Sequence, residues 1–278
     1  MEPMIDWMKL WKELVIAQCR YWERKGKGRR KKDNWKNRAK DFDKKVKKRW
    51  ERPDPHREFI LSRLKKTPGA TVLDIGAGTG SWAVLMAPHA ERITALEPSE
   101  HMRSVMIKNL ERAGINNVDV LAESWPSVDV ETHDYSFCSH AMYGAEDLSA
   151  FVCAMVAATR QTCFLLLRAP DWKGLLATAA LNVWGQPNDS PNFQVAYNLL
   201  LQMGIYPNVF IEPPGLWPPW THDSFSGALW ELLHRFSVEE GTREAEELQA
   251  LLESRLIRKE GKVIWPVEIR TALVYWDI

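Results

Sequence analysis

The 278-residue chain has few cysteines and no long apolar run. Its four cysteines, Cys19, Cys138, Cys153 and Cys163, form no Cys-x-x-Cys pair, which argues against a disulfide framework or a zinc site. No stretch approaches the roughly 18–20 apolar residues that span a bilayer. The first residues lack the basic region and apolar stretch of a secretion signal. These absences favour a cytoplasmic protein with reduced thiols.

The net charge is only +1, but the basic residues are concentrated near the N-terminus. Residues 20–52 contain 17 Lys/Arg and 5 Asp/Glu, a net charge of +12, so the remainder of the chain carries −11. The run 25–32 is rich in Lys, Arg and Gly, and we expect it to form an exposed loop. Apolar residues then recur at helical spacing, at Trp35, Ala39, Phe42, Val46 and Trp50. This stripe predicts an amphipathic helix that packs on the body of the protein.

From residue 71 onward, short apolar stretches alternate with helical patterns. We predict strands at residues 71–75, 93–96, 118–121, 135–139, 163–167 and 208–211, with a last strand within 263–275. We predict helices at residues 4–22, 35–50, 54–66, 80–90, 99–113, 148–158, 193–203, 224–236 and 243–258. Strands that alternate with helices imply right-handed crossovers and a parallel sheet covered on both faces. The expected fold class is therefore α/β, with a seven-stranded, mostly parallel sheet.

A glycine-rich turn follows the first predicted strand. Residues 72–80 read Val-Leu-Asp-Ile-Gly-Ala-Gly-Thr-Gly. Gly76 and Gly78 fit a dinucleotide fingerprint, but Ser81 stands where its last glycine or alanine belongs. A phosphate-binding loop of the Gly-x-x-x-x-Gly-Lys type is absent from the sequence. Asp74 lies inside the turn, where it would repel a pyrophosphate and attract the ammonium group of an amino-acid cofactor.

A second acidic residue, Glu97, ends the next predicted strand, where it can accept hydrogen bonds from two ribose hydroxyls. The two features together resemble the class I S-adenosylmethionine (SAM)-dependent methyltransferase family. Residues 72–80 match its first motif, and Leu96-Glu97-Pro98-Ser99 matches its second. The resemblance implies a Rossmann-like sheet with helices on both faces. It also implies methyl transfer from SAM, with S-adenosylhomocysteine as the product.

The resemblance assigns the cofactor-binding residues in order along the chain. The methionine end of SAM falls to the glycine loop, namely Asp74, Gly76, Ala77, Gly78 and Gly80. Glu97 would hold the ribose, and Pro98 would line the adenine.

The third motif departs from the family pattern, because Leu121 occupies the usual position of an adenine-binding Asp. Either Glu123 binds the adenine amino group or the backbone amides of Ala122 and Glu123 do. Ser139 ends the fourth strand, where family members face the methyl group.

The acceptor side of the site offers His140 as the candidate catalytic residue, because it ends a strand that faces the cleft. A structural, hydrogen-bonded histidine is the alternative, and His56 and His222 are weaker candidates. The Asn/Asp-Pro-Pro-Tyr/Phe motif of base-amine and glutamine methyltransferases is absent after strand four. Residues 170–221, rich in Trp and Pro, are the expected insertion on the substrate side. No metal site is expected.

We therefore divide the chain into a basic helical extension, 1–66, which acts as a lid, and a methyltransferase domain, 67–278. The leading hypothesis is methyl transfer to a small-molecule acceptor. A second hypothesis is RNA methylation, with residues 20–52 contacting the nucleic acid. A third is a SAM-binding module without catalysis.

Overall fold

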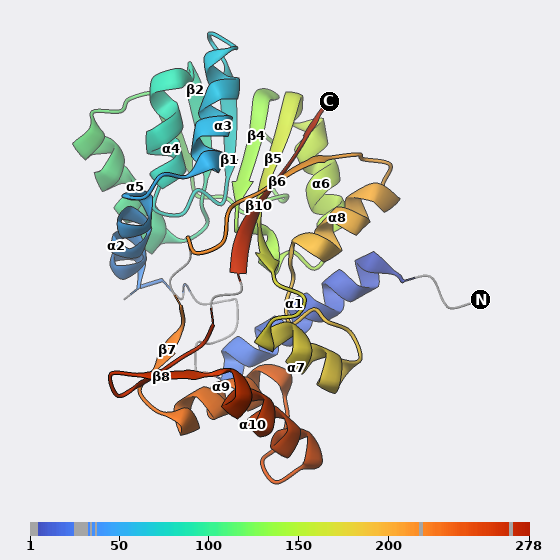
Figure 1. Ribbon diagram of the computed structural model, residues 1–278. Helices are drawn as coiled ribbons and strands as arrows, with labels where there is room; N and C mark the ends of the chain where they lie inside the picture. Colours follow the sequence, from blue (N-terminus) through green and yellow to red (C-terminus); the bar gives the residue numbers. More distant parts are fainter. Residues whose placement is uncertain (1–4, 25–32, 34, 37, 217–218, 267–268) are drawn as a thin grey trace.

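The computed structural model describes residues 5–24, 33, 35–36, 38–216, 219–266 and 269–278 (Figure 1). Within these ranges a seven-stranded sheet has the order β3-β2-β1-β4-β5-β10-β6. Its strands are β1 (Thr71–Ile75), β2 (Arg92–Leu96), β3 (Val118–Leu121), β4 (His133–Ser139), β5 (Thr159–Pro170), β6 (Asn208–Ile211) and β10 (Ile269–Asp277). The strands from β3 to β5 pair in parallel, and β10 is antiparallel to both of its neighbours. The predicted α/β fold with a mostly parallel sheet is confirmed.

Helices cover both faces of this sheet (Figure 1). One face carries α3 (Pro55–Lys65), α4 (Ser81–Met86) and α5 (Glu100–Ala113), and the other carries α1 (Trp7–Arg24), α6 (Leu148–Ala157) and α8 (Phe193–Gln202). Successive strand residues alternate between the two cores: Phe164 packs on the α3 side, whereas Leu165 packs on the α1 side. Because both faces are buried, the strands read as continuous apolar runs.

A second group of elements lies beyond the carboxyl end of β5. It comprises α7 (Leu175–Trp184), α9 (Phe225–Phe236), α10 (Arg243–Arg255) and a small sheet of β7 (Thr221–His222), β9 (Lys262–Ile264) and β8 (Ile257–Lys259). We call this group the accessory unit. It has its own core, which includes Leu176, Leu232, Phe236, Leu248 and Trp265. Figure 1 shows the accessory unit below the main sheet, on the side toward which the parallel strands point.

The segment 170–221 contributes to both parts of the molecule. α7 and β7 belong to the accessory unit, whereas α8 packs on α1, α6 and β5 and β6 pairs with β10. The accessory unit also takes in later residues, from α9 to β9. Neither α7 nor the small sheet was predicted from the sequence.

Two predicted helix ends were wrong. The helix expected at 80–90 ends at Met86, and residues 87–89 form the 3-10 turn η1 (Ala87–His89), because Pro88 has no N–H to continue the helix. The helix expected at 243–258 ends at Arg255, since residues 257–259 pair with β9 instead.

The basic helix α2 (Ala39–Trp50) packs on α5 with a face that differs from the expected one. Trp50 lies against Trp82 with ring centroids 5.2 Å apart, which confirms that this end of the stripe packs on the body. Asp43 is buried, however, and Phe42 remains 38% exposed. The expected burial of Phe42 is therefore wrong. The run 25–32, expected to be an exposed loop, lies outside the described residues.

The first helix connects the main sheet layer to the accessory unit. α1 packs on α6, α8 and α9, and the Trp11 indole nitrogen donates to the Ala145 carbonyl at 2.7 Å. Tyr21, near the end of α1, donates to Glu231 of α9 at 2.9 Å. Within the described ranges, no helix has the length and apolar character needed to cross a membrane.

Candidate functional site

The loop between β1 and α4 has an unusual backbone. Gly76, Gly78 and Gly80 all have positive φ, at 70°, 60° and 77°. A Cβ on Gly76 would lie 2.3 Å from the Cβ of Ala141, and one on Gly80 would lie 2.5 Å from a Met106 side-chain atom. Side chains are therefore excluded here both by conformation and by close packing. The contact with Ala141 also brings the residues after β4 directly against this loop.

Asp74 precedes the loop and is almost fully buried, with 1% of its surface exposed. Its Oδ2 has no hydrogen-bond partner in the described part of the chain. Burial, together with the nearby Glu97 carboxylate, raises the pKa of Asp74 from 3.8 to about 7. A buried acceptor without a partner is costly to a fold, and a cationic ligand would remove that cost.

Glu97 lies at the end of β2 and bonds directly to the glycine loop. Its Oε2 accepts from the Gly78 amide at 2.9 Å, and its Oε1 accepts from the Ser99 amide at 2.8 Å. Burial raises the pKa of Glu97 above its usual range, although these two hydrogen bonds oppose that effect. Each carboxylate oxygen can accept a further hydrogen bond, so acceptor capacity remains for a ligand.

The N-terminal arm contacts the same end of the sheet. Asp33 accepts from the Ser99 hydroxyl at 2.8 Å and from the His101 amide at 3.3 Å. Burial favours the protonated form of Asp33, but these hydrogen bonds stabilise the carboxylate, and the pKa of Asp33 is lowered. The segment before α2 therefore stands beside Glu97.

A second contact of the arm reaches the glycine loop through α5. The Asn109 side-chain amide donates to Asp43 at 2.9 Å and to the Thr79 carbonyl at 2.8 Å. Lys47 also binds both Asp43 and Asn109. This buried network explains why Asp43 occupies the packed face of α2 in place of an apolar residue.

The loop after β3 forms the exposed rim of this region. The Glu97 amide donates to the Leu121 carbonyl at 3.1 Å, which sets Ala122 and Glu123 beside the end of β2. Pro98, Ala122 and Glu123 are all exposed. Among the described residues, no hydrogen bond joins the Glu123 carboxylate to the glycine loop or to Glu97.

Comparisons with known proteins agree with this geometry. Residues 72–162 match the family model for a methyltransferase domain. An uncharacterized protein of Haemophilus influenzae is 24% identical over 239 residues, covering 82% of this chain and 83% of that protein. Protein-L-isoaspartate O-methyltransferase of Rhizobium meliloti is 36% identical over 61 residues, which are 22% of this chain and 30% of that enzyme. The solved structure of the YcgJ protein from Bacillus subtilis shares the fold, with a TM-score of 0.52 at 14% identity over 81% of this chain and 98% of that one.

Residues 72–162 therefore form a methyltransferase domain, and the sheet around them has the fold of class I SAM-dependent methyltransferases. SAM is the cofactor of this methyltransferase, and the residues at the loop fit it. The unpartnered Oδ2 of Asp74 suits a cation, and the missing Cβ atoms leave backbone that a ligand can approach. Among the described residues, no three His, Cys, Asp or Glu side chains gather as a metal site.

His140 follows β4 directly, and Ser139 is the last residue of that strand. The His140 backbone has a φ of 55°, which is unusual for a residue with a side chain. The His140 amide donates to the Leu166 carbonyl at 3.0 Å. Burial, with further contributions from Arg49, His56 and Arg168, lowers the pKa of His140 to about 3. The His140 imidazole is therefore neutral at physiological pH, and it is a weak base.

Tyr143, which the sequence argument missed, lies beside His140. The Tyr143 hydroxyl is 2.9 Å from the His140 Nδ1, and it accepts from the Arg168 amide at 2.5 Å. An amide N–H can only donate, so the proton of the tyrosine hydroxyl is available to Nδ1. Because Nδ1 accepts this proton, the neutral imidazole carries its own proton on Nε2. In the sequence, the only sign of this contact was a polar side chain three residues after the candidate histidine.

The two other histidines considered lie elsewhere. His56 is fully buried under β6, where its Nε2 is 3.0 Å from the Phe210 carbonyl. His222 lies in β7 of the accessory unit, 3.8 Å from Glu231. In the part of the chain that the structure describes, neither histidine bonds to the glycine loop.

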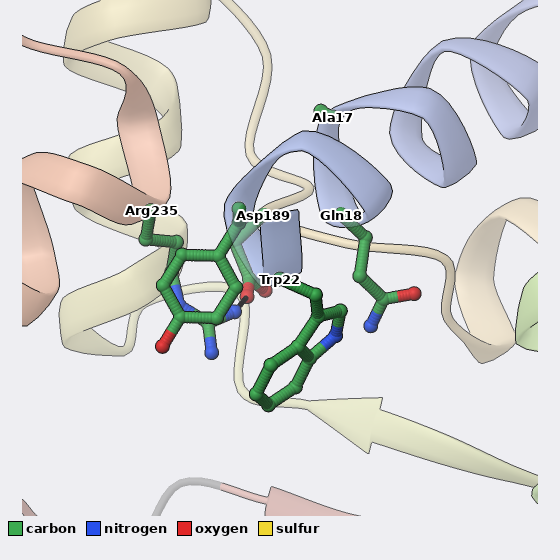
Figure 2. A pocket seen from close by; sticks show the side chains of 6 residues that line it. Ala17, Gln18, Trp22, Asp189 and Arg235 are labelled. Atoms are coloured by element: carbon green, nitrogen blue, oxygen red, sulfur yellow. Dashed lines mark hydrogen bonds and ion pairs between the residues drawn. The ribbon is translucent and has the colours of Figure 1, made fainter. Parts of the chain in front are cut away.

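A buried charge network, also missed from the sequence, attaches the accessory unit to β5. Asp189 binds Arg168 at 2.6 Å and Arg235 at 2.8 Å. Burial opposes ionisation, but the two guanidinium groups lower the pKa of Asp189 and keep it charged. Figure 2 shows the adjoining pocket, where Gln18 and Trp22 project from α1 toward Asp189 and Arg235. The network links the carboxyl end of β5 to α9 and α1.

Proposed function

We propose that this methyltransferase transfers the SAM methyl group to a small-molecule acceptor that binds in an enclosed space beside His140. The observation that carries the proposal is the place of His140, which is partly buried directly after β4, bonded to Tyr143 and next to Ala141, the residue packed against the glycine loop. The accessory unit lies beyond the carboxyl ends of the strands, over this side of the sheet (Figure 1). Methyl transfer is an in-line displacement that depends on alignment and exclusion of water, and an enclosed centre supplies both.

We assign the cofactor contacts to the residues gathered at the glycine loop. Asp74 pairs with the ammonium group, while Gly76, Ala77, Gly78 and Gly80 bring backbone close to the methionine part. Glu97 accepts from the ribose hydroxyls with the acceptor capacity left by its two amide bonds. When bound, SAM supplies the electrophilic methyl group.

The adenine and sulfonium contacts complete the assignment. Pro98, Ala122 and Glu123 form the adenine side of the site, and their exposure agrees with a position at its rim. Ser139 ends β4 beside the methyl group.

His140 acts on the acceptor as a neutral hydrogen-bonding group. A histidine whose pKa is about 3 removes protons poorly at neutral pH, so an orienting role suits it better than general base catalysis. Tyr143 fixes the tautomer by donating to Nδ1, so the imidazole carries its proton on Nε2. A nucleophile that loses its proton before it binds, such as a carboxylate, needs no base at the site.

The test is a screen of small-molecule extracts with methyl-labelled SAM, read by the mass of the labelled product. The expected result is a labelled compound of low mass that forms with the wild type and disappears with Asp74→Asn. His140→Ala should lower turnover without changing the calorimetric affinity for SAM. Transfer to nucleic acid alone would refute the small-molecule acceptor. Tight SAM binding without transfer to any acceptor would favour a SAM-binding module instead.

A further inference from the structure

The outer face of α2 carries a row of exposed lysines. Lys40, Lys44 and Lys48 follow one another at four-residue spacing, which aligns them along the helix about 6 Å apart. All three are exposed, and Lys45 stands beside them. Residues 36–52 hold nine basic and three acidic residues, a net charge of +6.

Little within the described part of the chain neutralises this row. Lys44 has an ion-pair partner, Asp41 at 3.8 Å, and both side chains are more than two-thirds exposed. Such a surface pair contributes little to stability and is easily displaced. The other lysines of the row form no ion pair with any residue that the structure describes. A helix needs no such charge density to pack on α5, because its packed side already contains Asp43 and Trp50.

Aromatic rings accompany the lysines at the start of the helix. Phe42 is 38% exposed and meets Trp35 edge to face, with ring centroids 5.3 Å apart. The Arg38 guanidinium lies 4.9 Å from the centre of the Trp35 ring. Helical spacing places Phe42 next to Arg38, four residues before it, and Lys45, three residues after it, on a different side of α2 from Lys40 and Lys44.

We propose that α2 binds single-stranded nucleic acid that crosses its exposed surface, with the lysine row and Lys45 on the phosphates and the Phe42–Trp35 pair, beside Arg38 and Lys45, against the bases. Proteins that bind single strands combine a cationic track with aromatic side chains on which bases stack. A duplex would conceal its bases from these rings. Insertion of α2 into a groove is opposed by its attachment to α5 along the Asp43 side.

A membrane surface accounts for the face less well. An interfacial helix buries a broad apolar face among the lipids. In α2 the apolar residues Ala39, Val46 and Trp50 are turned toward the body, and Phe42 alone among the helix's large apolar residues exceeds one-third exposure. The proposed surface is also distinct from the enclosed acceptor site, so it is independent of the proposed function.

The first test measures binding of fluorescein-labelled 20-nucleotide oligo(U) and oligo(dT) to the full chain by fluorescence anisotropy. Four phosphate contacts predict a slope of about −2.8 for log affinity against log salt, or about a 50-fold loss between 50 and 200 mM. Lys40→Gln/Lys44→Gln/Lys48→Gln should weaken binding at least tenfold at 50 mM salt and flatten the slope. Calorimetric affinity for SAM should not change, because none of these side chains contacts the glycine loop.

A matched control removes three lysines far from α2. Lys65→Gln/Lys66→Gln/Lys262→Gln makes the same change in net charge at exposed positions and should leave binding within twofold. Phe42→Leu keeps an apolar residue but removes the stacking ring, and it should weaken binding about tenfold even at 200 mM salt.

Three outcomes would overturn the proposal. The first is equal loss of binding in the two triple variants. The second is absence of oligonucleotide binding at 50 mM salt. The third is preferential binding to phosphatidylserine vesicles, which would make the face a membrane contact.

Discussion

Replacing Asp74 by asparagine should stabilise the ligand-free protein at alkaline pH while it abolishes SAM binding. The wild-type carboxyl is buried, and burial together with Glu97 raises its pKa from 3.8 to about 7. A tenfold change in proton affinity corresponds to about 1.4 kcal/mol. The rise of the Asp74 pKa from 3.8 to about 7 therefore means that an ionised Asp74 costs the folded state about 4 kcal/mol. Asparagine has nearly the same volume and carries no charge.

The pH dependence gives the sign of this effect. Below about pH 4 the carboxyl is protonated in both states, and the charge costs nothing. Between pH 4 and 7 the unfolded chain ionises while the folded chain does not, so wild-type stability falls. Above pH 7 the full cost is present. The free energy of unfolding of Asp74→Asn, relative to wild type, should therefore rise by about 4 kcal/mol from pH 4 to pH 8. Any constant cost of burying the amide cancels from this difference.

Urea unfolding, followed by tryptophan fluorescence at five pH values, measures the difference. Calorimetry on the same samples should show that wild-type affinity for SAM rises from pH 6 to 8, because the ammonium group needs the ionised carboxylate. The variant should bind at least tenfold more weakly at pH 8. A stability difference that does not change with pH, or unchanged SAM affinity, would refute the role of this carboxyl.

Asp134→Asn is the matched control, because the wild-type linkage there has the opposite sign. Burial opposes ionisation of Asp134, but hydrogen bonds from Arg160 and Thr71 lower its pKa to about 2. The stability that these bonds provide is present above about pH 4 and is lost as the pH falls through the folded-state pKa. This variant should therefore lose stability relative to wild type as the pH rises, and it should bind SAM normally.

Three further substitutions test the geometry of the site. Gly76→Ala should abolish SAM binding and destabilise the fold by several kcal/mol, whereas Gly114→Ala, with similar φ but no neighbour within 4 Å, should cost only the backbone strain of about 1–2 kcal/mol in urea unfolding. Tyr143→Phe leaves the Arg168 amide without an acceptor, so it should cost about 1–3 kcal/mol and lower turnover while the calorimetric SAM affinity stays constant. Asp189→Asn removes the carboxylate between two buried guanidinium groups, so it should lower the free energy of unfolding in urea by about 3 kcal/mol or more. A smaller loss would argue that this network does not attach the accessory unit to β5.

The main sheet was readable from the sequence because its signals are local. The parallel strands contain short apolar runs, and the crossover helices α5 and α6 begin at the capping residues Ser99 and Asp147. The accessory unit was less readable, since the edge strands β7 and β8 contain only 2 and 3 residues. Strands this short depend on pairing between distant segments, and local propensity does not predict such pairs.

The cofactor site was predictable to the extent that its residues follow strands. Asp74, Gly76 and Glu97 come together because neighbouring parallel strands end at the same edge of the sheet, and their order in the sequence is enough to show this. The loop after β3 was less certain because Leu121 departs from the family motif, and its exposure agrees with a position at the rim.

The tertiary structure determined which side chains surround the edge of the sheet where the parallel strands end. Asp33 on Ser99, Asp43 on Asn109, and Tyr143 between His140 and Arg168 are contacts that no spacing rule could reveal. The same holds for α2, where the periodicity indicated a packed apolar stripe. Because a buried polar network with α5 rotates the packed face to Asp43, Phe42 stays exposed beside Lys45. The sequence by itself determined the glycine loop, since strand order and glycine conformation are local properties. Burial and long-range hydrogen bonding determined the titration of Asp74 and His140 and the face that α2 presents to solvent.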